Sequence, residues 1–269
     1  MAIQGEEGKV VWGTDFLGPT EDTDITVADA DSLVRDDVLV VAVSGDLAVN
    51  SLITEPNGVW TFSGAGAAAD GVGLIGPVAR PDRNGTMEVW ARLKSSVVTD
   101  CRFFLGFAST ADRDETVVPF TLSGTTLTAN NAGEAVGWYF DAQATTDQVR
   151  FMSSTAGTAD TTASVFNHQT GVQTTLGSLG IGATSMTLTA DKYFMCKIEM
   201  DNDGTVRGYI GDETMAGAKG MKLIATLRAG TMGITSLYNP LCMAVAGSTG
   251  DPLWSIDFFK GRYNRYWGA

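Results

Sequence analysis

The stretch 193–210 contains a complete β-hairpin pattern and constrains the fold more than any other part of the chain. In its first half, apolar residues alternate with polar ones such as Lys197 and Glu199, which gives a strand one apolar and one hydrated face. An Asp-Asn-Asp-Gly turn follows at 201–204, and an extended pattern resumes after it. The chain is therefore expected to consist of antiparallel strands.

Length and composition fit a single all-β domain. The chain has 269 residues, 44% of them hydrophobic, and contains 32 glycines but only 7 prolines. This composition is typical of many short strands joined by tight turns, and sandwiches of about 200–250 residues commonly form one domain. We expect one β-sandwich domain over residues 1–269.

Short apolar or alternating stretches predict the other strands. They are 10–17, 38–43, 59–62, 74–78, 87–93, 102–108, 117–122, 137–141, 148–152, 221–227, 241–246 and 254–259. Edge strands and long loops are expected over 153–175. The segment 20–37 is the most acidic of the chain and predicts a solvated loop with one helical turn near 28–34. A calcium site there is an alternative, although the spacing matches no recognisable ligand loop.

The net charge of −13, from 31 acidic and 18 basic residues, argues against nucleic acid as a partner. One segment departs from this balance, the basic and aromatic C-terminal tail 260–269. Its candidate contact residues are Lys260, Arg262, Tyr263, Arg265, Tyr266 and Trp267. Contact with a phosphate or a base is one interpretation. A terminal strand with solubilising charges, or a contact with a neighbouring subunit, is the favoured one, because Arg and aromatic residues dominate interfaces.

Several kinds of site and location are not expected. No stretch approaches the roughly 18 apolar residues of a membrane span, and residues 1–10 lack the apolar core of a secretion signal, so neither membrane nor secretion is expected. Cys101, Cys196 and Cys242 lie in apolar stretches and predict buried free thiols. His168 is the only histidine and lies in a polar stretch, where we expect it exposed. Zinc, non-haem iron and a Ser-His-Asp arrangement are therefore not expected.

Three stretches carry a family resemblance: Trp90-Ala-Arg-Leu93, the strand-turn-strand at 196–210, and the closing Ile256-Asp-Phe-Phe259. They resemble concanavalin A-like and laminin-G-like jelly-roll proteins, and the resemblance covers the chain from Val10 to its end. It implies a jelly-roll β-sandwich of two antiparallel sheets. Lectins, glycosidases and structural proteins share this architecture, so the resemblance specifies fold and not function. The glycine-, threonine- and alanine-rich acidic chain also resembles structural proteins of tailed-bacteriophage particles.

A glucanase is one functional alternative. Laminarinase-type glucanases of this fold carry Glu-x-Asp-x-Glu on one strand, where two glutamates act as nucleophile and general acid. Here the pattern is Glu199-Met-Asp201-Asn-Asp203, and the last position is a shorter aspartate inside the predicted turn. Turn chemistry already explains Asp201 and Asp203. We therefore expect no catalytic residues.

A lectin-like, carbohydrate-binding module is the other alternative. Trp60, Trp90, Trp138 and Tyr139 are candidates for an aromatic platform that holds a glycan, although core packing would explain them equally well. No cofactor is expected. If calcium is bound, Asp201 and Asp203 are the candidate ligands.

The sequence favours a non-enzymatic virion protein, a capsid decoration protein on the outer surface of a tailed phage. The negative charge would repel packaged DNA, which favours an outward position. Such a protein would assemble in the bacterial cytoplasm as a homo-oligomer, with a trimer expected, and would contact the major capsid protein or other virion proteins through 260–269. Glycans are the alternative partners.

Overall fold

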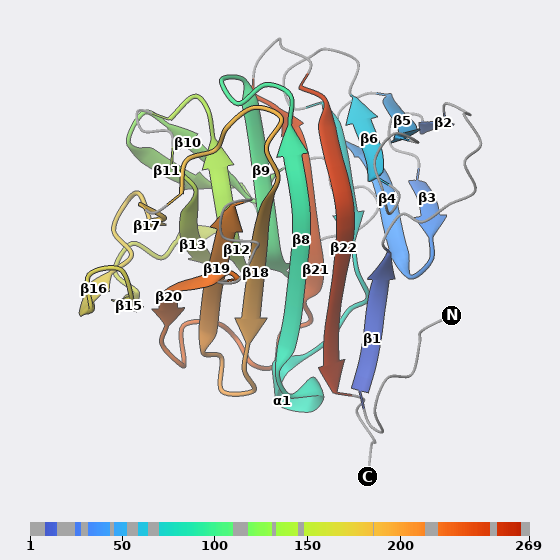
Figure 1. Cartoon of the computed structure of the whole chain (residues 1–269). Coiled ribbons are helices and arrows are strands. Elements are labelled where there is room, and N and C mark those ends of the chain that lie inside the picture. Colours follow the sequence, from blue (N-terminus) through green and yellow to red (C-terminus); the bar gives the residue numbers. More distant parts are fainter. Residues whose placement is uncertain are drawn as a thin grey trace.

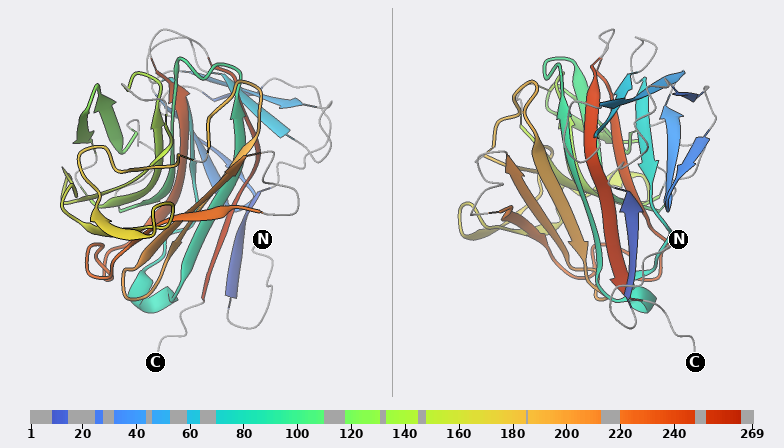
Figure 2. Two further views of the ribbon diagram at one scale, coloured as in Figure 1. Left: turned by 60° about the vertical axis from the view of Figure 1, so that its left-hand side comes forward. Right: turned by 45° about the vertical axis from the view of Figure 1, so that its right-hand side comes forward.

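The computed structural model describes residues 9–14, 25–27, 32–43, 46–52, 59–63, 70–109, 118–130, 133–144, 148–184, 186–212, 220–247 and 252–264. In these ranges the chain forms two large sheets whose paired strands are antiparallel throughout. We call the eleven-stranded sheet, which lies nearer the viewer in Figure 1, the front sheet, and the nine-stranded sheet the back sheet. The two sheets lie face to face, as the turned views in Figure 2 also show.

The strands of the front sheet follow one another in an order far from their order in the chain. From one edge to the other they are β16 (Val172–Thr175), β15 (Ser164–Asn167), β20 (Lys222–Leu227), β19 (Val206–Asp212), β18 (Phe194–Met200), β8 (Met87–Ser95), β22 (Trp254–Asn264), β6 (Val59–Ser63), β5 (Leu47–Leu52) and β2 (Ile25–Val27), and β1 (Lys9–Thr14) pairs with the second half of β22.

The back sheet is built in the same way. Its order is β14 (Thr158–Ala159), β13 (Arg150–Thr155), β12 (Ala135–Asp141), β9 (Cys101–Ala108), β21 (Asn239–Ala246), β7 (Gly71–Ile75), β4 (Val38–Val43) and β3 (Ser32–Arg35), with β17 (Ile181–Gly182) beside β13. A separate hairpin is formed by β10 (Phe120–Ser123) and β11 (Thr126–Ala129), and the helix in the described ranges is the single turn α1 (Pro81–Asn84).

The main core lies between the two sheets. Phe103 of the back sheet packs against Phe194 of the front sheet, with ring centroids 4.9 Å apart, and against Trp254 at 6.2 Å. All three cysteines are buried and free, as predicted, and burial raises the pKa of the Cys242 thiol to about 12. The apolar alternation of the sequence thus places its inward residues in a continuous layer.

A second apolar layer covers the outer face of the back sheet. Phe120 of the β10–β11 hairpin packs over this face, with its ring centroid 5.9 Å from those of Phe104 and Tyr139. The Tyr139 hydroxyl donates to the buried Asp141 carboxylate at 2.8 Å, and Arg102 Nε lies 3.1 Å from the same carboxylate. Strands β9 and β12 are therefore buried on both faces.

The predicted hairpin is confirmed as β18 and β19. Their register pairs Met200 with Val206, and the backbone amide of Gly204 donates to the carbonyl of Asp201 at 3.0 Å to close the turn. Gly204 has a φ of +80°, a conformation that side chains with a Cβ rarely adopt. Most of the other predicted strands are also present, and their bounds differ by a few residues from those expected.

Replacing Gly204 with alanine is expected to lower the free energy of unfolding by about 2 kcal/mol, as measured by urea denaturation. The added Cβ would adopt the strained φ and would also lie 2.8 Å from the Met232 carbonyl oxygen. Gly171→Ala is the matched control, because Gly171 has a φ of +70° and no atom within 4 Å of a built Cβ. A loss no larger than that of the control would contradict the close contact with Met232.

The acidic segment 20–37 is a correction to the sequence analysis. In place of a loop with a helical turn near 28–34, it contains β2 (Ile25–Val27) and β3 (Ser32–Arg35). Each of these strands ends its sheet and pairs with one neighbour, β2 with β5 and β3 with β4. An edge strand needs only one partner and tolerates charged neighbours, so an acidic composition does not exclude it.

Candidate functional site

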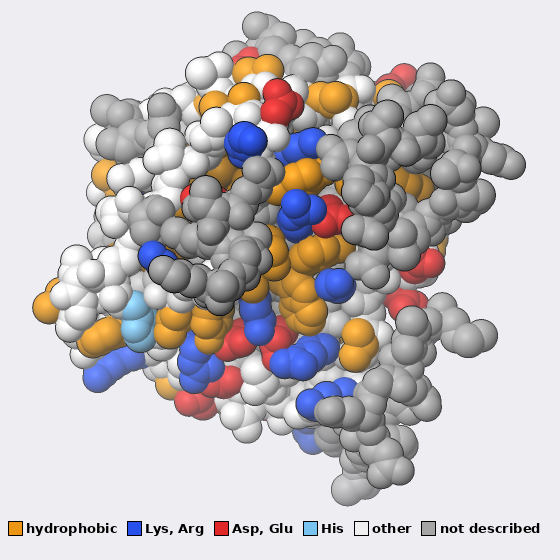
Figure 3. Space-filling model, viewed as in Figure 1, with side chains coloured by type: hydrophobic (Ala, Val, Ile, Leu, Met, Phe, Trp, Pro, Cys, Tyr) orange, Lys and Arg blue, Asp and Glu red, His pale blue; other side chains and the backbone are white. Residues whose placement is uncertain are grey.

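The front sheet presents a mixed polar and aromatic surface to solvent over β8, β18, β19 and β22. We call this surface the front face. It is formed by the residues that alternate with the core-facing ones on these strands, such as the partly buried Trp90 and Arg92 and the more deeply buried Glu88 on β8. Figure 3 shows basic and acidic side chains gathered among apolar ones over the middle of the sheet.

Strand register places an aromatic side chain on each side of Lys197. Lys197 of β18 is the direct partner of Trp90 on β8 and of Tyr209 on β19. Its Nζ lies 5.6 Å from the centroid of each ring, within the range of a cation–π contact. Trp90 and Tyr209 are both partly buried, so each ring keeps some contact with solvent.

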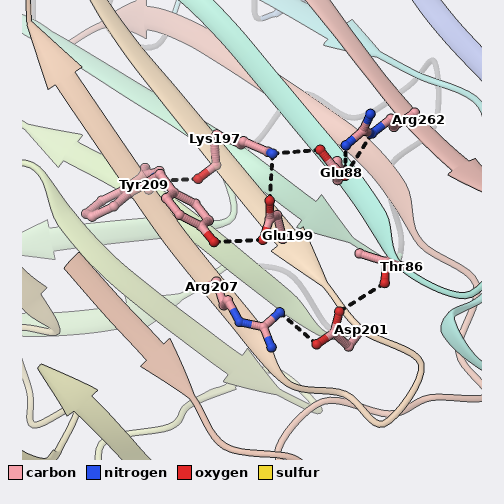
Figure 4. Close-up of polar contacts among 9 residues, drawn as sticks. Thr86, Glu88, Lys197, Glu199, Asp201, Arg207, Tyr209 and Arg262 are labelled. Carbon is pink, nitrogen blue, oxygen red and sulfur yellow. Dashed lines mark hydrogen bonds and ion pairs between the residues drawn. The ribbon is translucent and has the colours of Figure 1, made fainter. Parts of the chain in front are cut away.

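Two carboxylates of like charge also face each other on this surface. Glu88 and Glu199 are direct cross-strand partners, an arrangement that is destabilising without a counter-charge. Lys197 supplies that charge, because its Nζ lies 2.6 Å from Glu88 Oε2 and 2.6 Å from Glu199 Oε1 (Figure 4). The other two oxygens are also occupied, Glu88 Oε1 by the Arg262 guanidinium at 2.7 and 2.8 Å and Glu199 Oε2 by the Tyr209 hydroxyl at 2.8 Å.

This network keeps Glu88 ionised. Burial alone would raise the pKa of Glu88, but the hydrogen bonds from Lys197 and Arg262 outweigh it and leave the pKa below its ordinary value. Burial, together with the hydrogen bond to the Glu199 carboxylate, raises the pKa of Tyr209 to about 12. A general acid for glycoside hydrolysis needs the opposite, a carboxyl group whose pKa is raised toward neutrality.

The glucanase pattern does not assemble on this strand. Glu199 and Asp201 share the front face, where Asp201 is 2.7 Å from Arg207 and accepts a hydrogen bond from the Thr86 hydroxyl at 3.0 Å (Figure 4). Asp203 is exposed in the turn, and its carboxylate accepts the backbone N–H of Thr205 at 2.8 Å. The Asp203 carboxylate therefore caps the turn and does not face Glu199. This agrees with the expectation from the sequence that Asp203 lies inside the turn.

Asp201 and Asp203, the calcium ligands considered from the sequence, each already have a partner within the protein. One carboxylate is engaged by Arg207 and the other by the backbone of the turn. In the part of the chain that the structure describes, no three His, Cys, Asp or Glu side chains lie close enough together to hold a metal ion.

Most of the aromatic rings that the sequence suggested as a glycan platform are buried, which corrects that expectation. Trp138 and Tyr139 are fully buried on β12, Trp138 in the main core and Tyr139 under the β10–β11 hairpin. Trp60 is also buried, with 6% of its surface exposed. Of the four predicted rings, Trp90 alone remains accessible to a ligand.

The C-terminal segment is a strand as far as Asn264 and not a free tail. Lys260, Arg262 and Tyr263 belong to β22, which lies between β8 and β1 at this point. Tyr263 packs against the main core, where burial raises its pKa, and only part of its side chain is exposed. Lys260 and Arg262 join the front face, whereas Arg265, Tyr266 and Trp267 lie outside the described residues.

His168 is exposed, as predicted. Its Nε2 lies 2.9 Å from the Thr226 hydroxyl and its ring packs edge-on against Phe166, with the centroids 4.7 Å apart. These contacts give it no part in the front face.

In the described ranges, no helix is long and apolar enough to cross a membrane.

Sequence reasoning missed Glu88 and Tyr209 as members of the site. Both lie at alternating polar positions, which marks them as solvent-facing, but their contact with Lys197 depends on which strands are neighbours. Glu88 and Glu199 are more than a hundred residues apart, so only the sheet order brings them together.

No protein-family model matches the chain, and no curated protein sequence is similar to it. Among solved structures, a protein of unknown function from Shewanella oneidensis MR-1 matches with a TM-score of 0.57 at 12% identity, over 100% of this chain and 92% of that one. Peanut lectin matches with a TM-score of 0.45 at 10% identity, over 95% and 97% of the two chains. A non-specific endo-β-1,3(4)-glucanase from family GH16 matches with a TM-score of 0.45 at 10% identity, over 98% and 95%.

At 10–12% sequence identity, a structural similarity concerns the fold alone. The two matches with TM-scores below 0.5, peanut lectin and the glucanase, give no argument about what this chain binds. These comparisons support neither the virion role nor the homo-oligomer, and both stay predictions from the sequence. The two facing antiparallel sheets form the all-β sandwich that the sequence predicts.

Proposed function

We propose that this protein is a non-catalytic carbohydrate-binding module and that Trp90 on the front face is the centre of its site. The observation that carries the proposal is the row of Trp90, Lys197 and Tyr209 on one continuous sheet surface. This row borders the side chains of Glu88 and Glu199, which share the Lys197 ammonium group. A sugar ring has an apolar face of C–H groups and a rim of hydroxyl groups. An aromatic ring next to charged hydrogen-bonding side chains suits both parts.

The rigidity of the site supports the proposal. Glu88, Lys197 and Glu199 have side chains that are only 9% to 19% exposed, and each polar atom of the two carboxylates has a partner. Side chains fixed by packing and by ion pairs lose little conformational entropy when a ligand binds. Their strands also hold them at a regular spacing of about 4.8 Å from one strand to the next.

The same contacts favour binding without hydrolysis. Retaining glycosidases need one protonated and one ionised carboxyl group about 5–5.5 Å apart. Here Lys197 stands between Glu88 and Glu199, and the lowered pKa of Glu88 keeps that group from carrying a proton at neutral pH. We therefore propose that the front face binds a saccharide and releases it unchanged.

Trp90→Ala is expected to weaken binding to a polysaccharide by about tenfold or more, because an aromatic anchor at the centre of a site contributes most of its affinity. Native affinity electrophoresis in gels that contain neutral or acidic polysaccharides measures the retardation. Leu237→Ala is the control, since Leu237 is an apolar side chain that is 56% exposed next to β21 of the back sheet.

Two results would overturn the proposal. One is the absence of retardation by every polysaccharide in the set, or retardation that Trp90→Ala leaves unchanged. The other is release of reducing sugar from a bound glucan that Glu199→Gln abolishes, which would make the protein a glucanase.

A further inference from the structure

Positive charge gathers on the front face although the chain as a whole is acidic, with a net charge of −13. Among the described residues, β8, β18, β19, β22 and the turn that begins at Asp201 carry six basic side chains against five acidic ones. The basic residues are Arg92, Lys94, Lys197, Arg207, Lys260 and Arg262, and the acidic ones are Glu88, Glu199, Asp201, Asp212 and Asp257. These strands therefore carry a small excess of positive charge, whereas the protein as a whole is negative.

The two kinds of charge are not evenly mixed. Glu88, Glu199 and Asp201 lie toward one end of the face, where Lys197, Arg207 and Arg262 pair with them. Toward the other end, Arg92 and Lys94 converge on one aromatic ring. The Arg92 guanidinium carbon lies 3.8 Å and Lys94 Nζ 4.5 Å from the centroid of the Tyr193 ring.

Tyr193 also lines a hollow of about 290 Å³ at the start of β18. Its wall also contains one basic and one acidic side chain, Lys192 and Asp212. The remaining lining residues are Thr187, Leu188, Thr189 and Phe194. This volume is close to the lower limit of about 300 Å³ for pockets that hold small ligands. The basic end of the front face therefore adjoins a concave space that can receive one sugar unit.

Trp90 lies next to this basic end. Trp90, Arg92 and Lys94 alternate along β8, so their side chains leave the same face of the strand about 7 Å apart. Arg92 is also held by Asp257, with Arg92 Nη1 2.7 Å from Oδ2. A saccharide that stacks on Trp90 thus brings its next unit to Arg92 and Lys94.

From these observations we infer that the saccharide is anionic, with carboxylate or sulfate groups, and that Arg92 and Lys94 receive its charged group beside the hollow at Tyr193. This inference rests on the proposed function, because it names the class of ligand for the same face. A guanidinium and an ammonium group at one place suit a carboxylate or a sulfate, and both attract it at long range.

The test compares ligands that differ only in charge. Calorimetric titration of the full chain with oligogalacturonate and with its methyl ester, and with dextran sulfate and dextran, separates charge from sugar shape. The charged member of at least one pair is expected to bind about tenfold more tightly at about 0.05 M salt, and the difference should shrink at about 0.5 M salt. Lys94→Gln and Arg92→Gln should each reduce this preference for the charged member several-fold. Lys222→Gln is the control, because Lys222 is an exposed lysine at the start of β20.

Each outcome decides between the two proposals. Equal binding of both members of each pair, with loss on Trp90→Ala, would overturn the anionic ligand and leave carbohydrate binding in place. No binding of any of the four saccharides would overturn both. A thymidine oligonucleotide that binds as tightly as the acidic saccharides would show a general polyanion surface and would also overturn the inference. If Arg92→Gln fails to fold, as a melting curve would reveal, Lys94→Gln alone carries the test.

Discussion

Trp138→Ala is expected to lower the free energy of unfolding by about 4 kcal/mol, because it removes the largest kind of side chain from the main core. Trp138 is fully buried and packs edge-on against Phe151, with ring centroids 5.8 Å apart. Its indole N–H donates to the Lys197 carbonyl oxygen at 3.2 Å, and this bond joins the back sheet to the front sheet. Gly208 of β19 approaches the indole so closely that a built Cβ would lie 3.0 Å from it.

Urea denaturation monitored by circular dichroism measures this loss, and Trp90→Ala is the matched control. The same change of residue type at Trp90 removes a partly buried ring from the front face and should cost about 1 kcal/mol. Equal losses for the two variants would mean that Trp138 is not a core residue. The platform of Trp138 and Tyr139 that the sequence analysis considered would then return as a binding surface.

The burial of Trp138 and Tyr139 could not be predicted from the local sequence pattern. Residues 135–140 form a run of apolar and aromatic residues and glycine without alternation, which is compatible with burial on both faces or with an exposed platform. The second apolar layer decides between these, because the β10–β11 hairpin covers Tyr139 from outside. A cover supplied by another part of the chain leaves no periodic signal in the strand itself.

The hairpin of β18 and β19 was predictable for the opposite reason. All its determinants lie within twenty residues: an alternating strand, an Asp-Asn-Asp-Gly turn and a second strand. The acidic segment around β2 and β3 misled the analysis because composition reports on solvent contact and not on hydrogen bonding. Val34 of β3 is 68% exposed and still belongs to a strand at the edge of the sheet.

The candidate site was predictable only in its separate parts. Trp90 and Glu199 were recognisable as surface residues of strands, and Lys260 and Arg262 as basic residues near the end of the chain. These residues are neighbours only because the sheet has the strand order β19, β18, β8, β22, in which strands distant in sequence are adjacent. Local patterns contain no information on that order.

Lys197→Met is expected to lower the free energy of unfolding by about 3 kcal/mol at pH 7, because it leaves two facing carboxylates without their shared counter-charge. Methionine keeps most of the apolar stem between Trp90 and Tyr209, so the change isolates the charge. Glu88 would retain Arg262, and Glu199 would retain only the Tyr209 hydroxyl. Lys222→Met, an exposed lysine on β20, is the control and should change stability by less than about 0.5 kcal/mol.

The pH dependence of this loss separates charge from packing. In the wild type the pKa of Glu88 is lowered, so its contribution to stability is present at neutral pH and is lost as the pH falls through that pKa. In Lys197→Met, repulsion between the carboxylates favours a proton on one of them, so the variant becomes less destabilised as the pH falls. The difference in unfolding free energy between the two proteins should therefore shrink from pH 7 toward about pH 4. A difference that stays constant over this range would assign the role of Lys197 to its aliphatic stem and would remove its ion pairs with Glu88 and Glu199 from the binding site.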